Sequence, residues 1–141
     1  MYRVMIIDDE KALRNLLKAS VDWQEMGLEV VGEAASGIEA INIIDKLRPD
    51  IIFVDIRMPF MDGIEFSKIA LKRYRQMKII ILTAFDEFEY AKEAVHLEIK
   101  EYMLKPISAT ELSDSLVKLK NTLDKEREEK LNVKKLEDYF Q

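Results

Sequence analysis

Five short apolar runs, each followed by a stretch with helical spacing, constrain the fold of this chain more than any other feature. The runs occupy residues 4–7, 29–34, 51–54, 78–82 and 101–104. Three segments within them, VMII, IIFV and IIIL, are apolar at every position, which is typical of strands buried on both faces of a parallel sheet. The stretches between the runs repeat apolar residues three or four positions apart and therefore predict crossover helices. These apolar residues are Leu13, Leu16 and Leu17; Ile38, Ile41 and Ile44; Phe66, Ile69 and Ala70; and Phe88, Ala91, Ala94 and Val95.

Turn and cap residues divide the chain at the same places. Pro49 stops the second helical stretch, and Asp62-Gly63 forms a turn before the third. After Pro106, the segment Ser-Ala-Thr-Glu at 108–111 matches a capping box that opens a fifth helix. That helix carries a leucine stripe at Leu112, Leu116, Leu119 and Leu123. The whole pattern predicts an α/β fold, a flavodoxin-like (βα)5 doubly wound parallel sheet with strand order 2-1-3-4-5.

Composition narrows the classes of function. The 141 residues suffice for one domain with a short extension, and 27 acidic against 22 basic side chains give a net charge of -5. An acidic chain of this kind does not suit a domain that grips the nucleic-acid backbone. Without cysteine and with the single histidine His96, no thiolate or histidine-rich metal site is expected. The first apolar run is short, so no signal peptide or membrane span is predicted and the cytoplasm is the expected location.

Acidic residues follow two predicted strands that should be neighbours. Asp8, Asp9 and Glu10 come directly after the first strand, and Asp55 comes directly after the third. Neighbouring strands lie about 4.8 Å apart, so these carboxylates can share one ion, and without a cation they repel one another. A site with oxygen ligands alone favours a hard ion, Mg²⁺ above all. For Asp9 the alternative is a helix cap, whereas Asp55 lies too far before the next helix to cap it.

A hydroxyl and an ammonium group occur at the ends of the two remaining strands of that edge. Thr83 ends the fourth strand, and Lys105 follows the fifth. Each residue alone is usually structural or solvated. Together with the carboxylates they form a set suited to holding a phosphoryl group, because the cations take up oxygen charge and the hydroxyl donates a hydrogen bond.

Several short motifs together resemble the receiver domain of two-component response regulators, over residues 2 to about 122. The motifs are Asp8-Asp9, Asp55 with Met58-Pro59 and Asp62-Gly63, Thr83-Ala84, and Tyr102 three residues before Lys105-Pro106. The resemblance implies that Asp55 accepts a phosphoryl group from a phosphohistidine on a sensor histidine kinase. It also implies Mg²⁺ bound by Asp9, Asp55 and the backbone carbonyl of Arg57, with Asp8 acting largely through bound water.

The same resemblance implies roles for the residues at the other strand ends. Lys105 would pair with the phosphoryl group, and the Lys105-Pro106 peptide bond would be cis. Thr83 would move toward the phosphoryl group and Tyr102 would turn inward behind it. This would shift an existing equilibrium at the face formed by the fourth helix, the fifth strand and the fifth helix. The alternative for Tyr102 is an ordinary tyrosine of the core.

Residues 20–40, SVDWQEMGLEVVGEAASGIEA, are similar to receivers joined to AraC-type helix-turn-helix output domains. In those receivers a Trp, here Trp23, lies before the second strand; the alternative for Trp23 is packing at a helix end. We therefore predict a receiver domain at 1–124 and a charged helical extension or linker at 125–141. DNA would be bound only through an output domain that this chain does not contain. The extension is either a solvated helix that frays or a connector, and a coiled coil is only partly supported because Glu126 and Lys130 fall at apolar heptad positions.

One segment departs from the common receiver pattern, and two further residues lie at positions that affect how long the phosphoryl group persists. Many receivers have Gly-Ala-x-Asp before the tyrosine, whereas this chain has Glu98-Ile-Lys-Glu101, which puts the end of the fourth helix in doubt. Arg57 and Phe85 lie where receivers tune the lifetime of the phosphoryl group, and bulky Phe85 is expected to hinder attacking water.

The predicted function is that of a phosphoacceptor signalling domain, which catalyses only its own phosphorylation and dephosphorylation. One alternative is a magnesium-dependent phosphohydrolase of the haloacid-dehalogenase type, although that type has Asp-x-Asp after the first strand and a covering insertion. The other is a receiver-like interaction module that works without phosphorylation. A homodimer is left open, through the face named above or through the leucine stripe, for which the core is the alternative. No membrane partner is expected.

Overall fold

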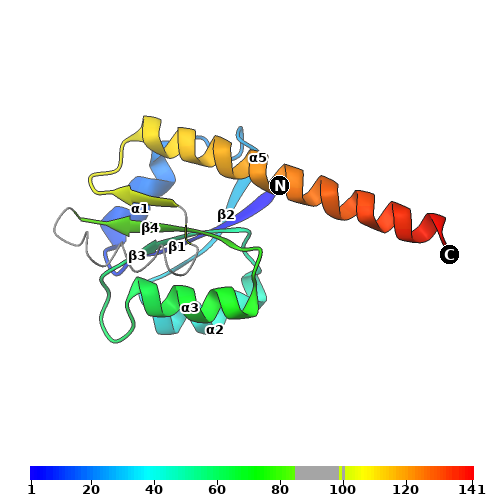
Figure 1. The fold of residues 1–141 in the computed structure, drawn as a ribbon. Coiled ribbons are helices and arrows are strands. Elements are labelled where there is room, and N and C mark those ends of the chain that lie inside the picture. The colour runs from blue at the N-terminus through cyan, green and yellow to red at the C-terminus, as the bar shows by residue number, and fades with distance from the viewer. Residues whose placement is uncertain (85–98, 100) are drawn as a thin grey trace.

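The computed structural model describes residues 1–84, 99 and 101–141 of the chain. In this part, five strands form one sheet: β1 (Tyr2–Ile7), β2 (Leu28–Ala34), β3 (Ile51–Asp55), β4 (Lys78–Thr83) and β5 (Glu101–Leu104). The helices are α1 (Lys11–Ser20), α2 (Gly37–Leu47), α3 (Gly63–Arg73) and α5 (Ala109–Tyr139). Figure 1 shows the sheet between two helical layers, with α1 and α5 on one face and α2 and α3 on the other.

The strands are parallel and are hydrogen-bonded in the order β2-β1-β3-β4-β5. This confirms the predicted doubly wound sheet and its strand order. The observed β1 begins two residues before the predicted run, and the other strands agree with the prediction to within one residue. Because the order reverses beside β1, the carboxyl ends of β1 and β3 are neighbours, which is where folds of this kind bind ligands.

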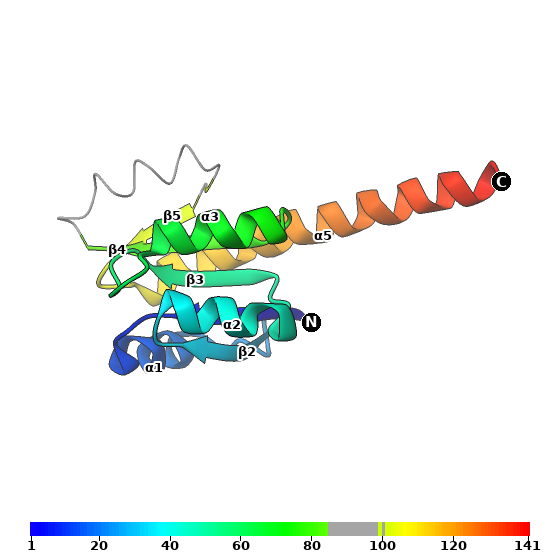
Figure 2. The same cartoon turned by 90° about the horizontal axis from the view of Figure 1, so that it is seen from below.

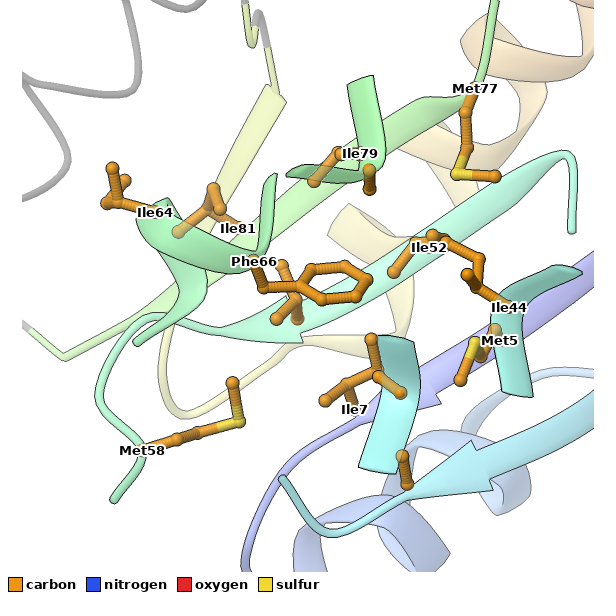
Figure 3. Packing of buried hydrophobic residues seen from close by; sticks show 14 of the residues in the cluster. Met5, Ile7, Ile44, Ile52, Met58, Ile64, Phe66, Met77, Ile79 and Ile81 are labelled. Carbon is orange, nitrogen blue, oxygen red and sulfur yellow. The ribbon is translucent and has the colours of Figure 1, made fainter. Parts of the chain in front are cut away.

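Hydrophobic packing on both faces explains why the strands are apolar at nearly every position. Alternate residues of a strand point to opposite faces, and here both faces are covered. One cluster packs residues such as Met5, Ile52 and Phe66 between the sheet and the helices α2 and α3 (Figure 3). The other packs residues such as Val4 and Leu116 between the sheet and the helices α1 and α5. Figure 2 shows the molecule from below, looking onto the side of the sheet that carries α2 and α3.

Two apolar residues assigned to the buried helical faces are exposed instead. Leu16 in α1 is 51% exposed and Ile38 in α2 is 50% exposed. Successive residues of a helix are rotated by about 100°, so Leu16 points away from its buried neighbour Leu17 and Ile38 points away from Ala40. The helix predicted around residues 88–95 lies outside the described residues.

Trp23 packs at the end of α1, as its simpler interpretation requires. Its side chain is buried, its indole Nε1 donates a hydrogen bond to the carbonyl of Lys18 at 3.1 Å, and its ring meets Phe53 edge-on with centroids 6.0 Å apart. Trp23 therefore closes the core between α1 and β3.

Helix α5 begins at the predicted capping box, because the Ser108 side chain accepts a hydrogen bond from the backbone nitrogen of Glu111 at 3.3 Å. Its leucine stripe is buried against the sheet and so belongs to the core, which removes the stripe as a dimer surface. The helix then continues without interruption to Tyr139 and projects past the sheet (Figures 1 and 2). The domain boundary predicted after residue 124 lies inside this helix. Among the described residues, none of the helices has the length and apolar character needed to cross a membrane.

Candidate functional site

Three carboxylates converge at the carboxyl edge of the sheet. Ile7 pairs with Val54 in the register of β1 and β3, so Asp8 directly after β1 lies beside Asp55 at the end of β3. One carboxylate oxygen from each of Asp8, Asp9 and Asp55 lies within 4.8 Å of the others. The strand order thus brings Asp55 beside two residues that precede it by 46 and 47 positions in the sequence.

Asp8 is the most deeply buried member of this cluster. Its exposed fraction is 0%, and its Oδ1 accepts a hydrogen bond from the backbone nitrogen of Glu10 at 2.9 Å. Its Oδ2 accepts no hydrogen bond from the residues that the structure describes. Asp9 is exposed, and α1 is capped at Glu10 without a side-chain hydrogen bond, so the alternative that Asp9 caps this helix is wrong.

Lys105 supplies a positive charge to the same cluster. Its Nζ donates a hydrogen bond to Asp55 Oδ1 at 3.0 Å and lies 3.5 Å from Asp8 Oδ2. Its backbone nitrogen donates a hydrogen bond to the carbonyl of Thr83 at 2.8 Å, which fixes it to the end of β4. The Lys105-Pro106 peptide bond is cis, as expected.

The electrostatics of the cluster are dominated by burial. Desolvation raises the pKa of Asp55 to about 6, with repulsion from Asp8 adding to the effect and the hydrogen bond from Lys105 opposing it. Desolvation likewise raises the pKa of Asp8 above its usual value. Burial lowers the pKa of Lys105, but the hydrogen bond and the attraction from Asp55 outweigh it, so the net pKa is raised and this lysine stays protonated. One lysine therefore faces more carboxylate charge than it can neutralise.

The donor set fits a hard divalent cation. The oxygens of Asp8, Asp9 and Asp55 are close enough to share an ion. The buried Oδ2 of Asp8 has only the ion pair with Lys105 at 3.5 Å and, within the described residues, lacks a hydrogen bond that water or an ion would satisfy. A carboxylate site without nitrogen or sulfur ligands, in part exposed through Asp9, suits Mg²⁺, which keeps several of its waters. The predicted convergence of carboxylates is thus present in the fold.

The other predicted site residues differ in their burial. Thr83 is fully buried, and its Oγ1 donates to the carbonyl of Ala84 at 3.1 Å. Arg57 is exposed in the loop after β3. Tyr102 is 43% exposed on β5, so the alternative of a core tyrosine is wrong. Phe85 lies outside the described residues.

Two residues near the site were not singled out for it in the sequence. Arg14 of α1 donates from Nη1 to the backbone carbonyl of Asp8 at 2.5 Å and from Nε to Glu33 of β2 at 3.0 Å. Gly63 begins α3 so close to β3 that an added Cβ would lie 2.5 Å from the carbonyl oxygen of Asp55. A positive residue in the first helix after the strand was the available signal for Arg14, and the Asp62-Gly63 turn was the signal for Gly63. In the structure Asp62 is the N-cap of α3, accepting from the backbone nitrogen of Glu65 at 2.8 Å.

Comparison with known protein families shows to which family this chain belongs. The model of the response regulator receiver domain matches residues 4–117, which is most of the chain. The chain is a response regulator receiver domain. As such it is a signalling phosphoacceptor rather than an enzyme acting on a separate metabolite.

Several curated relatives of this receiver are named as transcriptional regulatory proteins. It is 35% identical over 116 residues to the uncharacterized transcriptional regulatory protein YesN of Bacillus subtilis, covering 82% of this chain and 32% of that protein. It is 39% identical over 126 residues to the transcriptional regulatory protein BtsR of Salmonella typhi, covering 89% of this chain and 51% of that protein. The receiver therefore spans about a third to a half of the length of these relatives.

Solved receivers agree with the fold in detail. The receiver domain of AraT, a response regulator from Geobacillus stearothermophilus, matches with a TM-score of 0.86 and 39% identity, over 89% of this chain and 98% of that one. A two-component transcriptional regulator AraC from Clostridium phytofermentans matches with a TM-score of 0.84 and 34% identity, over 90% of this chain and 98% of that one. The receiver thus has relatives among regulators of the AraC type, as its residues 20–40 indicated.

Proposed function

We propose that Asp55 is the phosphoacceptor of this receiver and that it takes its phosphoryl group from a phosphohistidine of a sensor histidine kinase. One observation carries the proposal: the nearly buried Asp55 carboxylate lies 3.0 Å from Lys105 and within reach of Asp8 and Asp9. A carboxylate so placed has a cation beside it and two acids that can hold a metal. This arrangement supports nucleophilic attack on phosphorus.

In the transfer step, a carboxylate oxygen of Asp55 forms a bond to phosphorus while the phosphorus–nitrogen bond of the phosphohistidine breaks. The imidazole nitrogen leaves with the electron pair of that bond. Lys105 donates to the transferred phosphoryl oxygens, and its anchoring to Thr83 keeps the ammonium group in position. Asp9 and Asp55, whose oxygens converge with those of Asp8, would hold Mg²⁺ together with the backbone carbonyl of Arg57, and Asp8 would act largely through bound water. The ion, when bound, neutralises carboxylate and phosphoryl charge.

Phosphorylation then changes the charge at the end of β3. A phosphoryl group carries about -1.5 to -2 charges at pH 7, more than the single charge of the carboxylate. We propose that the Thr83 hydroxyl turns from the Ala84 carbonyl toward this group and that Tyr102, now 43% exposed, turns inward. The proposed output is a shift of an existing equilibrium at the face that includes β5 and α5.

Incubation with acetyl phosphate and Mg²⁺ tests the phosphoacceptor. We expect intact-protein mass spectrometry to show the addition of one phosphoryl group to the unaltered chain and none to Asp55→Asn. Asp138→Asn, at the exposed end of α5, is the matched control and should be phosphorylated normally. Equal labelling of Asp55→Asn would refute the assignment. Rapid release of phosphate without a detectable adduct would favour a phosphohydrolase, and absence of both would favour an interaction module.

We infer further that the intact protein regulates transcription, because its relatives YesN and BtsR are named as transcriptional regulatory proteins. The cytoplasm, which is typical of response regulators, is the proposed location. The receiver would act through a DNA-binding output domain, with the segment 125–141 as the helical connection. The test is to compare DNA binding by the intact protein before and after phosphorylation. A phosphorylation-independent affinity would remove this part of the proposal.

A further inference from the structure

A second charged region lies at the opposite edge of the sheet from the carboxylate cluster. There, the amino end of β1, the loops after α2 and α3, and the middle of α5 enclose a hollow of about 670 Å³. In Figure 1 this is the side where the N-terminus lies and where α5 leaves the sheet. The floor of the hollow contains Pro49, Met77 and Leu123, all buried. A volume of this size accommodates a small organic ligand.

The charge around this hollow is opposite to that of the chain. Basic side chains around it come from three separate segments: Arg48, Lys72, Arg73, Arg75, Arg127 and Lys130. Against these six stand two acidic residues, Asp50 and Glu126, although the whole chain has a net charge of -5. A local excess of positive charge in an acidic chain concentrates anions there.

Part of this charge has a structural explanation. Lys72 and Arg73 lie in the last turn of α3, where the helix dipole favours cations, and Arg73 also pairs with Asp45 at 3.3 Å. Neither explanation, a position in the last turn of a helix or an acidic partner, applies to Arg75 and Lys130. Arg75 lies past the end of α3 and Lys130 lies in the middle of α5, and neither has an acidic partner within the described part of the chain. These two cations remain available to a ligand.

Two arginines at the hollow are oriented by aromatic rings. The guanidinium carbon of Arg127 lies 4.8 Å from the ring centroid of Tyr2, and that of Arg48 lies 5.2 Å from the ring centroid of Tyr74. A ring that stacks against a guanidinium restrains it but leaves its N–H groups able to donate at their edges. Of the two acids at the hollow, Glu126 is already paired with Lys78 at 2.7 Å and Asp50 accepts a hydrogen bond from the backbone nitrogen of Arg3 at 2.8 Å, so each opposes an anion less than a free carboxylate would.

We propose that this hollow binds an oligophosphate anion, a chain of two or more phosphoryl groups, either free or attached to a nucleoside. Several phosphoryl groups match several separated cations, whereas a single carboxylate would engage only one or two of them. The ligand would bridge Arg75 after α3 with Lys130 on α5. Its binding would thereby connect the segment of α5 beyond Leu123 to the loop after α3, at a site separate from the carboxylate cluster.

Isothermal titration calorimetry with tripolyphosphate, in buffer freed of divalent metal, tests the site. We expect saturable binding at one site per chain, weakened at least tenfold in the double variant Arg75→Gln/Lys130→Gln. The matched control is Lys134→Gln/Lys135→Gln, which removes the same charge from the exposed part of α5 and should change the affinity by less than twofold. Thermal melting checks that both variants are folded, and Lys72→Gln/Lys130→Gln replaces the first variant if it is not.

Either of two results with tripolyphosphate would overturn the proposal. Absence of saturable binding at millimolar tripolyphosphate would do so, as would an equal loss in both double variants, which would indicate general attraction to a basic helix. Adenosine triphosphate and adenosine separate the two sources of the ligand. Equal affinity for tripolyphosphate and adenosine triphosphate assigns the site to oligophosphate itself, and tighter binding of adenosine triphosphate assigns it to nucleoside polyphosphates. Binding of adenosine, which has no phosphate, would contradict a site for phosphate chains.

Discussion

Asp55 has to meet two opposing requirements. As the proposed nucleophile it must be ionised, yet burial and the nearby charge of Asp8 favour its neutral form and raise its pKa to about 6. Lys105 opposes this effect with a hydrogen bond at 3.0 Å, and a cation among the three carboxylates would oppose it further. The metal-free protein therefore holds Asp55 in its ionised form at neutral pH at some cost in stability.

This cost should be measurable as a dependence of stability on pH. A carboxyl group whose pKa is raised by folding, here from 3.8 to about 6, stabilises the fold below the lower value, and this contribution is lost as the pH rises through 6. Asp55→Asn removes the cost of keeping a buried carboxylate ionised. In metal-free buffer at pH 7.5 the free energy of unfolding of this variant should therefore exceed that of the parent protein by about 1 to 3 kcal/mol. Urea unfolding between pH 4 and 7.5 measures it. A difference that does not shrink toward pH 4 would contradict this explanation.

Phe60 is a second residue whose conformation lowers the stability of the fold. It adopts a left-handed backbone conformation with φ of 68°, and its side chain is 95% exposed. A residue with a Cβ loses about 1 to 2 kcal/mol in this conformation, which glycine adopts freely. We expect Phe60→Gly to raise the free energy of unfolding by about 0.5 to 1 kcal/mol, measured by urea unfolding. Phe60→Ala keeps the strain and should give no gain, so equal gains in both variants would point to the exposed ring instead.

The site residues could largely be predicted from the sequence, for a local reason. Asp8, Asp55, Thr83 and Lys105 each end or follow an apolar run, and parallel strands bring such positions to one edge. Arg14 could not be assigned in this way. Its contacts with the Asp8 carbonyl and Glu33 depend on how α1 is rotated against β2, which no spacing in the sequence specifies.

At the scale of elements, α5 combines two kinds of helix. Its first half is amphipathic and buries the leucine stripe, whereas from Arg127 onward every residue is exposed. The change from one half to the other occurs at residues 124–126, where Glu126 pairs with Lys78 of β4 and Asp124 accepts a hydrogen bond from the hydroxyl of Tyr2 in β1. Tertiary packing therefore stabilises the first half, and the second half depends on its own helix propensity and side-chain pairs.

Truncation of leucines along α5 should show this division. Leu123 is 8% exposed and Leu131 is 52% exposed, so the two residues differ in burial but not in chemistry. Leu123→Ala should lower the free energy of unfolding by about 2 to 4 kcal/mol, because it leaves a cavity in the core. Leu131→Ala should change it by less than about 0.5 kcal/mol. Chemical denaturation followed by Trp23 fluorescence measures both, and a large effect of Leu131→Ala would mean that the second half is packed in solution.

Helix existence could be predicted better than helix orientation. The three- and four-residue spacing located α1, α2 and α3, and the Ser108 cap located the start of α5. The exposure of Leu16 and Ile38 could not be predicted, since periodicity marks an apolar face without giving the width of the surface that covers it.

At the scale of the whole molecule, the two edges of the sheet carry opposite charge. The carboxyl edge gathers Asp8, Asp9 and Asp55, and the amino edge gathers the basic hollow. The first could be predicted because its residues lie at strand ends. The second could not, because its side chains come from loops and from a helix whose direction past the sheet only the folded structure supplies.

Metal binding at the carboxyl edge should stabilise the whole domain. A ligand that binds the folded state alone adds about 2.7 kcal/mol to the free energy of unfolding at a hundredfold excess over its dissociation constant. We expect Mg²⁺ to raise the melting temperature of the parent protein and of Asp138→Asn alike. Asp9→Asn removes an exposed proposed ligand without disturbing the core, and most of the increase should disappear. Differential scanning calorimetry across a magnesium titration tests this, and full retention in Asp9→Asn would exclude that residue as a ligand.

Because α5 continues without interruption from the sheet to Tyr139, its outer part moves as a rigid extension of the part packed on the sheet. From Leu123 to Tyr139 the helix extends about 24 Å at 1.5 Å per residue, so a tilt of about 10° at its base would sweep the tip through about 4 Å. A displacement too small to disturb the packing of the leucines would thus be amplified into one that a neighbouring domain could register.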